Sequence, residues 1–165
     1  MLARWVEPSG SFESVFPVFL QILLAAGCAC QRASLKWDKC GMAEEKANQK
    51  DVWIGFDLGG TKMLTVAYGP EWKAIGRKRR KTRGGEKGDV GIERIGNTVA
   101  RLLEECELSK DRIAGIGIGC PGPIDLDKGR VTMAPNLGWD DVDVAGYLKE
   151  RFSCPTVVIN DVDAG

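Results

Sequence analysis

The chain has 165 residues, enough for one domain of ordinary size, and its 44% hydrophobic and 28% charged fractions are typical of a soluble globular protein. Basic and acidic residues number 23 each, so no overall charge field points to nucleic acid or to an anionic membrane. The sequence contains no histidine, which excludes a Ser–His or Cys–His catalytic pair and an imidazole metal ligand within these residues. General-base chemistry then falls to Asp, Glu, Lys, Cys or Tyr.

Residues 1–50 differ from the rest, and we expect them to form a poorly structured extension. Residues 15–30 are an apolar run that is too short and interrupted for a membrane span. An export signal is the alternative, but Glu7 and Glu13 precede the run, whereas such signals begin with basic residues. We therefore interpret Met42 as the natural start, with residues 1–41 a mis-assigned upstream extension, and we expect no membrane association.

Six cysteines are spread along the chain without a spacing typical of a zinc site. The three that follow Met42 lie among apolar residues, so we expect buried free thiols and not disulfides, as in a reducing cytoplasm. The six positions are Cys28, Cys30, Cys40, Cys106, Cys120 and Cys154.

Regular apolar alternation begins at Val52. Residues 52–57 predict a first strand, residues 61–68 its hairpin partner, and residues 72–82 a third antiparallel strand with a basic end. A helix follows, with Asp89 as its expected cap. Its apolar positions follow the 3.6-residue period and are Ile95, Val99, Leu102, Leu103 and Cys106.

The second half of the chain predicts two more strands around a second helix. Residues 113–119 read as a small buried strand, and residues 156–159 as an apolar strand near the end. The helix between them has apolar residues one turn apart and either Asp141 or Asp143 as its cap. The resulting order β-β-β-α-β-α-β predicts an α/β domain over residues 51–165, with a mixed sheet covered by helices.

A phosphate-binding turn is predicted between the first two strands. Gly59 and Gly60 let the backbone approach a polyanion and point successive N–H groups at it, while Thr61 and Lys62 add a hydroxyl and a charge. Asp57, at the end of the strand, would hold Mg²⁺ directly or through water. A plain Gly-Gly hairpin turn is the simpler alternative. The segment is neither a Walker A loop nor a dinucleotide fingerprint.

A second candidate ligand loop follows the strand at residues 113–119. Residues 119–125, with two glycines and two prolines, form a stiff loop whose backbone groups stay available to a ligand, and Gly122 lies at its centre. Asn136 can donate and accept a hydrogen bond at once, which suits a sugar hydroxyl. Trp139 would either stack on a sugar face or, as we favour, pack beneath the loop.

The last predicted strand ends at Asn160 and Asp161. Ligands bind at the carboxyl ends of strands in open α/β sheets. There the Asp161 carboxylate could accept a proton from a substrate hydroxyl that attacks a γ-phosphoryl group, and Asn160 could orient the sugar. Alone, an Asn-Asp pair after a strand is more often a turn or a helix cap. Its combination with the phosphate-binding turn favours a catalytic role.

These motifs together resemble the ROK family (repressors, open reading frames and kinases). The resemblance covers about residues 51–165, and it is carried by IGFDLGGTK at 54–62, GIGIGCPGPID at 115–125, GRVTMAPNLGW at 129–139 and VVINDVDAG at 157–165. It implies an actin-like ATPase (ribonuclease H-like) domain. The GCPGPID and APNLxW forms look most like the glucokinase-type members.

The resemblance also implies roles for individual residues. Asp57, Gly59, Gly60, Thr61 and Lys62 match the first phosphate motif. Gly122, Asn136 and Asn160 match the sugar site, and Asp161 matches the catalytic base. The implied reaction is phosphorylation of a hexose, often glucose at its 6-hydroxyl, with ATP and Mg²⁺. The hexose and the choice of ATP or polyphosphate stay open.

Family members continue into a second domain, which is missing here and which supplies further sugar contacts, a structural zinc site and the adenosine pocket. We therefore expect this fragment to be inactive, and the full-length protein to be a cytoplasmic homodimer.

Three rival hypotheses remain. One is a sugar-sensing ROK-type transcriptional regulator, although residues 1–50 show no helix-turn-helix pattern. Another is a nucleic-acid-binding module built on the basic residues 77–83, which more simply protect an edge strand from pairing, so we expect no nucleic acid partner. The third is a remnant without activity.

Overall fold

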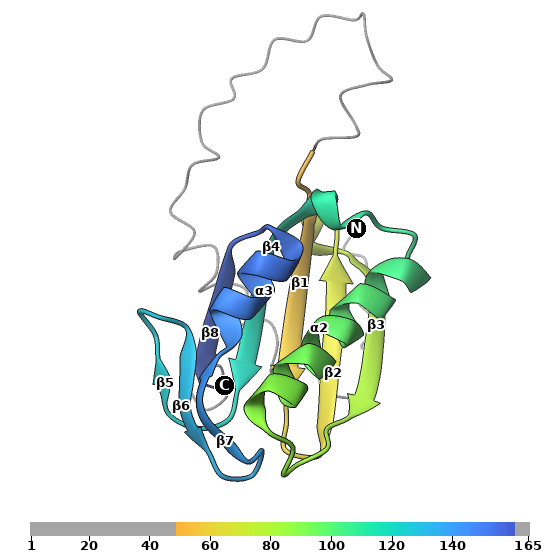
Figure 1. Cartoon of the computed structure of the whole chain (residues 1–165). Helices are drawn as coiled ribbons and strands as arrows, with labels where there is room; N and C mark the ends of the chain where they lie inside the picture. Colours follow the sequence, from red (N-terminus) through yellow and green to blue (C-terminus); the bar gives the residue numbers. More distant parts are fainter. Residues whose placement is uncertain (1–48, 161–165) are drawn as a thin grey trace, which may run out of the picture.

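A computed structural model describes residues 49–160 (Figure 1). The first three strands form an antiparallel unit in which β2 pairs with both β1 and β3. The long helix α2 follows β3. The bounds are Val52–Leu58 for β1, Lys62–Tyr68 for β2, Ala74–Lys81 for β3, Gly88–Glu105 for α2, and Pro70–Trp72 for the short helix η2 between β2 and β3.

The next main strands join this unit in parallel. β4 pairs with β1 and β8 pairs with β4, both parallel, which gives the sheet order β3-β2-β1-β4-β8. The predicted mixed sheet and its order of strands and helices are therefore confirmed. The bounds are Lys110–Arg112 for the short helix η3, Ile113–Cys120 for β4, Val144–Phe152 for α3 and Thr156–Asn160 for β8.

The sequence analysis missed a second, three-stranded antiparallel sheet between β4 and α3. It consists of β5 Ile124–Asp125, β6 Arg130–Ala134 and β7 Trp139–Asp143, with β6 in the middle. These strands are two to five residues long and partly exposed, so they are too short to show a clear alternation of apolar and polar residues.

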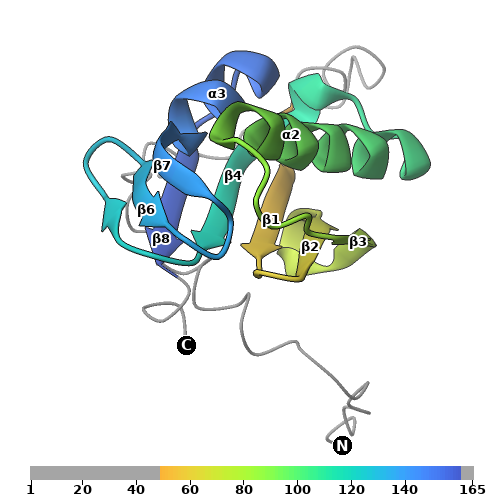
Figure 2. The same ribbon diagram turned by 60° about the horizontal axis from the view of Figure 1, so that its bottom comes forward.

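One face of the five-stranded sheet carries the main core. Figures 1 and 2 show α2 and α3 on this face. Strand side chains alternate between faces, so β1 directs every second residue at the helices. These residues, Val52, Ile54, Phe56 and Leu58, are at most 1% exposed. No helix among residues 49–160 combines the length and the apolar content that a membrane crossing requires.

The predicted helix caps were right for one helix and wrong for the other. Asp143 caps α3, because its Oδ1 accepts a hydrogen bond of 2.9 Å from the Gly146 amide. Asp89 is not the cap of α2 but lies in its first turn, where a carboxylate still interacts favourably with the helix dipole. The helix begins at Gly88, which lies against β7: a Cβ on Gly88 would lie 2.3 Å from Val142 Cγ2.

Trp139 packs in the interior and is 5% exposed, so of its two predicted roles the structure supports packing. Its indole ring lies directly against α2, where a Cβ on Gly91 would be 2.4 Å from Cζ2 of the ring. The contact joins the smaller sheet to the helix that covers the larger one.

The cysteines of the described residues are free thiols, as predicted. Cys120 and Cys154 are buried, and Cys106 is half-buried. Burial raises the pKa of Cys154 to about 11, so this thiol is protonated near neutral pH and is a weak nucleophile. The three cysteines before Met42 lie outside the described residues.

A bidentate ion pair ties the start of β1 to the start of β4. Arg112 Nε and a terminal guanidinium nitrogen donate to the two Asp51 oxygens at 2.9 and 2.8 Å. Hydrogen bonding from Arg112 lowers the pKa of Asp51 below 3.8. The carboxylate form is therefore favoured by folding, and its stabilising effect is fully present above the unfolded-state pKa.

Replacing Asp51 by Asn should lower the free energy of unfolding by about 1 kcal/mol near neutral pH. The difference from wild type should shrink as the pH falls through the folded-state pKa of Asp51, because the wild-type carboxyl then also becomes neutral. Urea unfolding of the 165-residue chain from pH ~7 to ~2.5 measures this. Glu150→Gln is the control, since the described residues give Glu150 no ion-pair partner; a Glu150→Gln profile equal to that of Asp51→Asn would contradict the assignment.

Replacing Gly91 by Ala should destabilise the fold by about 1–3 kcal/mol, because the new methyl group would overlap the Trp139 ring. This cost should exceed the gain of about 1 kcal/mol that alanine brings to a helix interior. Gly96→Ala in the same helix is the matched control, since its new methyl group meets the long Arg151 side chain, which can move at the cost of two hydrogen bonds, whereas the indole ring cannot. Denaturant unfolding should rank Gly96→Ala above Gly91→Ala; equal stabilities would show that the indole contact does not constrain α2.

Candidate functional site

The carboxyl ends of β1, β4 and β8 lie at one end of the sheet, because these three strands are parallel (Figure 1). Asp57 in β1 is level with Gly119 in β4, and Asn160 in β8 is level with Cys120 in β4. Neighbouring strands are about 4.8 Å apart, so β1 and β8 are about 10 Å apart at this end. The parallel sheet thus brings the predicted phosphate and sugar residues to the same end of the sheet.

The predicted phosphate-binding turn is a tight hairpin between β1 and β2. The Gly59 amide donates to the Lys62 carbonyl at 3.0 Å, and a Cβ on Gly59 would lie 2.8 Å from that oxygen. A larger residue would therefore disrupt the turn. Gly60, Thr61 and Lys62 are exposed. Among the described residues, the amides of Gly60 and Thr61 have no hydrogen-bond acceptor, so they are available to an anion.

Two lysines lie opposite each other on β2 and β3, beside this turn. Lys62 at the start of β2 pairs in register with Lys81 at the end of β3. Like charges directly opposite on neighbouring strands repel, and a bound polyanion relieves that repulsion. β3 is an edge strand of the described sheet, as predicted for the basic run. The turn therefore combines available amides with a concentrated positive charge.

Two predicted sugar-site residues contact each other. The Asn160 side-chain amide donates a hydrogen bond to the Gly122 carbonyl, which ties the loop after β4 to the end of β8. Gly122 has a φ of +99°, and a Cβ on it would lie 2.3 Å from the Met133 carbonyl oxygen. Both features require glycine, and the absence of a side chain lets the loop lie directly against β6.

The third predicted sugar residue lies on the other side of the site. Asn136 is exposed in the turn between β6 and β7, beside the phosphate turn: a Cβ on Gly60 would be 4.0 Å from Asn136 Cβ. Asn136 thus adjoins the predicted phosphate residues, whereas Asn160 and Gly122 form a separate pair. The predicted base, Asp161, lies outside the described residues.

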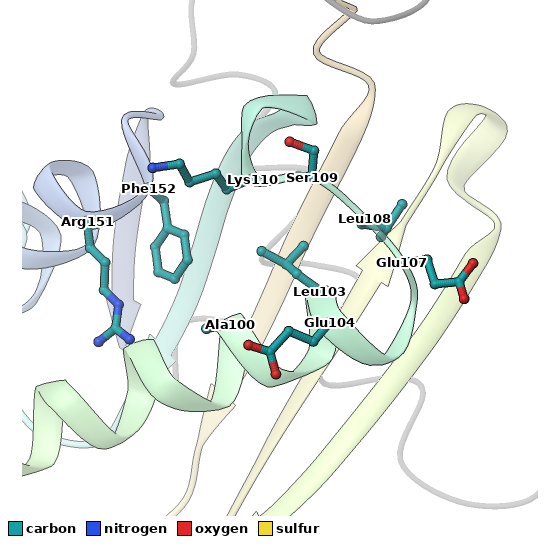
Figure 3. Close-up of a pocket in the computed structure, with 9 residues that line it drawn as sticks. All are labelled: Ala100, Leu103, Glu104, Glu107, Leu108, Ser109, Lys110, Arg151 and Phe152. Atoms are coloured by element: carbon teal, nitrogen blue, oxygen red, sulfur yellow. The ribbon is translucent and has the colours of Figure 1, made fainter.

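A hollow elsewhere on the molecule contains none of the predicted site residues (Figure 3). It lies at the opposite end of the sheet, beside the short helix η3 that leads into β4. Leu103, Leu108 and Phe152 form its apolar part, and its charged residues are Glu104, Glu107, Lys110 and Arg151. The predicted site residues therefore lie at the strand ends and not in this hollow.

Sequence reasoning missed two residues at the phosphate turn. Lys81 faces Lys62, and Thr82 donates hydrogen bonds to the turn from its amide and its hydroxyl. The pairing register that places them there is long-range. The available signal was the sequence TRGG, a turn-forming segment directly after a basic strand.

Comparison with known proteins identifies the family of this chain. The sequence profile of the ROK family matches residues 53–165. The glucokinase of Halalkalibacterium halodurans is 29% identical over 114 residues, which are 68% of this chain and 34% of that protein. The xylose repressor of Caldicellulosiruptor bescii is 28% identical over 118 residues, which are 70% of this chain and 30% of that protein. The chain therefore spans about a third of the length of these relatives.

The fold has matching solved structures. One is the crystal structure of a ROK family glucokinase from Streptomyces griseus in complex with glucose and AMPPNP, with a TM-score of 0.56 and 26% identity. The match covers 66% of this chain and 33% of that one. It confirms the predicted mixed α/β architecture of the actin-like ATPase fold. The profile match over most of the chain shows that it belongs to the ROK family.

Proposed function

We propose that the protein containing this chain is a sugar kinase that transfers the γ-phosphoryl group of ATP to a hexose, with glucose as the favoured substrate and glucose 6-phosphate as the product. The observation that carries this proposal is that the phosphate turn and the Asn160–Gly122 pair lie at the same end of the sheet. A turn suited to a polyanion ends β1, and a rigid polar pair, Asn160 and Gly122, lies two strands away. The kinship with glucokinases supports the choice of reaction.

The phosphate turn would bind the phosphoryl donor. Its exposed amides at Gly60 and Thr61 would donate to phosphate oxygens, and Lys62 with Lys81 would offset their negative charge. Asp57 would hold Mg²⁺ directly or through water. Mg²⁺ commonly binds through one or two carboxylates and substrate phosphates and keeps several of its waters. Bound Mg²⁺ would neutralise charge that develops on the phosphate oxygens.

The sugar would lie between the phosphate turn and the Asn160–Gly122 pair. Asn160 holds the Gly122 carbonyl with its amide N–H, and we propose that its side chain also orients the sugar. Asn136, which lies beside Gly60, would contact the hydroxyl nearest the donor. These residues would orient the acceptor, which is most of what phosphoryl transfer asks of a protein.

Asp161 would act as the general base. It follows Asn160, the last residue of β8, and Ile159 in that strand is level with Gly119 and through it with Asp57. The end of β8 therefore lies near the end of β1 in the sheet, with β4 between them. The Asp161 carboxylate would take the hydroxyl proton as the sugar oxygen bonds to the γ-phosphorus. The bond from that phosphorus to its bridging oxygen would break, and ADP would leave.

The remaining assignments concern the whole protein. Since this chain spans about a third of its relatives, we propose that a second domain supplies the adenosine pocket, further sugar contacts and a structural zinc site. We propose that the complete protein is a cytoplasmic homodimer. The 165-residue chain alone would bind sugar and nucleotide weakly and would show no useful turnover.

A sugar-sensing regulator is the second candidate, and similarity to a xylose repressor favours it. A regulator needs the sugar site but neither a phosphate turn nor a base, so the retained turn and Asp161 support a kinase. Two assays on the complete gene product separate the candidates. A kinase forms ADP when a hexose is supplied, whereas a regulator shifts promoter DNA in a sugar-dependent way.

Replacing Asp161 by Asn in the complete gene product should lower kcat by about 10²–10⁴-fold, the usual contribution of a general base. Hexose affinity should stay within about threefold, because the amide keeps the size of the carboxylate. ADP release measures kcat, and calorimetry measures sugar binding.

Asp163→Asn is the matched control, since it removes a carboxylate two residues further along the chain. It should retain wild-type turnover. Wild-type turnover in Asp161→Asn would show that another group accepts the proton.

A further inference from the structure

The segment between β3 and α2, residues 82–86, contacts both halves of the candidate site. We call this segment the clasp; its sequence is TRGGE, and it runs between the labels β3 and α2 in Figure 2. None of its residues has a role in the reaction proposed above. Its contacts with the phosphate turn, with the Asn136 turn and with α2 nevertheless account for how the site is held together.

At its first residue the clasp fixes the phosphate turn. The Thr82 hydroxyl donates to the Gly59 carbonyl at 2.8 Å, and the Thr82 amide donates to the Thr61 carbonyl at 2.9 Å. In a trans peptide the C=O and the following N–H point in opposite directions. Holding the Gly59 carbonyl toward Thr82 therefore directs the Gly60 amide away from β3. Thr82 thus sets the direction of an amide that would contact phosphate.

In its middle the clasp lies against the turn that carries Asn136. The Gly85 amide donates to the Leu137 carbonyl at 3.1 Å. A Cβ on Gly84 would lie 2.8 Å from the Asn136 carbonyl oxygen, and one on Gly138 would lie 3.1 Å from Gly85 Cα. Such close backbone contact is possible because these positions are glycines. The clasp therefore fixes the position of Asn136 as well as that of the phosphate turn.

At its last residue the clasp is anchored to α2. Arg94 donates three hydrogen bonds to the Glu86 carboxylate, at 2.6, 2.7 and 3.0 Å. Both side chains are less than a quarter exposed. A charged pair that is bidentate and largely shielded from solvent is well suited to hold a loop in one conformation. Through α2, the anchor connects the clasp to the main core.

We propose that the clasp sets the spacing between the phosphate turn and Asn136, with Thr82 as a positioning residue for phosphoryl donor binding. The inference deepens the proposed kinase function and rests on it. Thr82 acts by directing backbone amides of the turn, and Gly84 by allowing Asn136 to lie beside Gly60. Neither residue is assigned a contact with the reacting atoms.

The first test uses Thr82→Val in the complete gene product, with Thr82→Ser as the conservative variant. Valine keeps the shape of threonine but loses the hydroxyl donor to Gly59. We expect KM for ATP to rise about three- to tenfold, the loss typical of one hydrogen bond, while KM for the hexose changes by less than about twofold. Serine keeps the donor and should restore the wild-type KM for ATP.

The second test uses Gly84→Ala, whose methyl group would push the Asn136 backbone away from the clasp. Here we expect KM for the hexose to rise as well, because Asn136 is assigned to the sugar. Unfolding curves for each variant show whether the protein still folds. If Gly84→Ala does not fold, the Thr82→Val and Thr82→Ser comparison alone decides the inference, because the Gly84 contact is with the Asn136 backbone. Asn136→Ala then tests only whether the Asn136 side chain contacts the sugar, by raising KM for the hexose and leaving the unfolding midpoint unchanged.

The outcomes separate this inference from the proposed function. A wild-type protein without ADP release in the presence of any hexose would refute the kinase itself. An active wild type with an unchanged KM for ATP in Thr82→Val would overturn the clasp alone. The clasp would also be overturned if Thr82→Val lost stability and affinity for both substrates and Thr82→Ser did not restore them. Thr82 would then be a purely structural residue.

Discussion

Parallel pairing of β1, β4 and β8 is the constraint on which the candidate site depends. The residues of the site come from five separate segments of the chain, and local structure cannot bring them together. Because β4 pairs in parallel with strands on both sides, the carboxyl ends of all three strands lie at one end of the sheet. At that end of the sheet, β1 leads into the phosphate turn and β4 leads into the Gly122 loop. A shift of one residue in either register would turn Asp57 or Asn160 to the opposite face.

Much of this fold could be predicted from local patterns, since its principal strands and helices are long enough to show a period. β1 and β4 are nearly continuous apolar runs, as expected for buried parallel strands. The smaller sheet could not be predicted, because β5 has two residues and β6 and β7 have five each. Those strands are defined by pairing with one another. The cap of α2 was mispredicted because the helix begins at Gly88 after Lys87, whose side chain makes no capping hydrogen bond that a sequence pattern could reveal.

The glycines of the candidate site could be predicted from the sequence, but the residues that support them could not. Glycines that serve a turn are visible in sequence, and Gly59 and Gly122 indeed have no room for a side chain. What the motifs did not reveal is the support around them. Lys81 lies opposite Lys62 because of the β2–β3 register, and Thr82 reaches the turn because β3 ends beside it. Asn136 was assigned to the sugar from its chemistry and from the family resemblance, and its position beside Gly60 could be found only from the folded chain.

The arrangement also suggests how one domain can serve both enzymes and regulators. The contact between Asn160 and Gly122 depends on no phosphate, so a sugar site of this kind can exist without catalysis. Phosphoryl transfer adds two requirements: a turn with available amides and concentrated positive charge, and a carboxylate to accept the proton. Both additions are small, since they involve one hairpin turn and one side chain at the end of a strand. Loss of either would leave the sheet and the proposed sugar contacts intact. A shared scaffold can therefore bind a sugar for either purpose, and the phosphate turn with Asp161 is where the two functions would diverge.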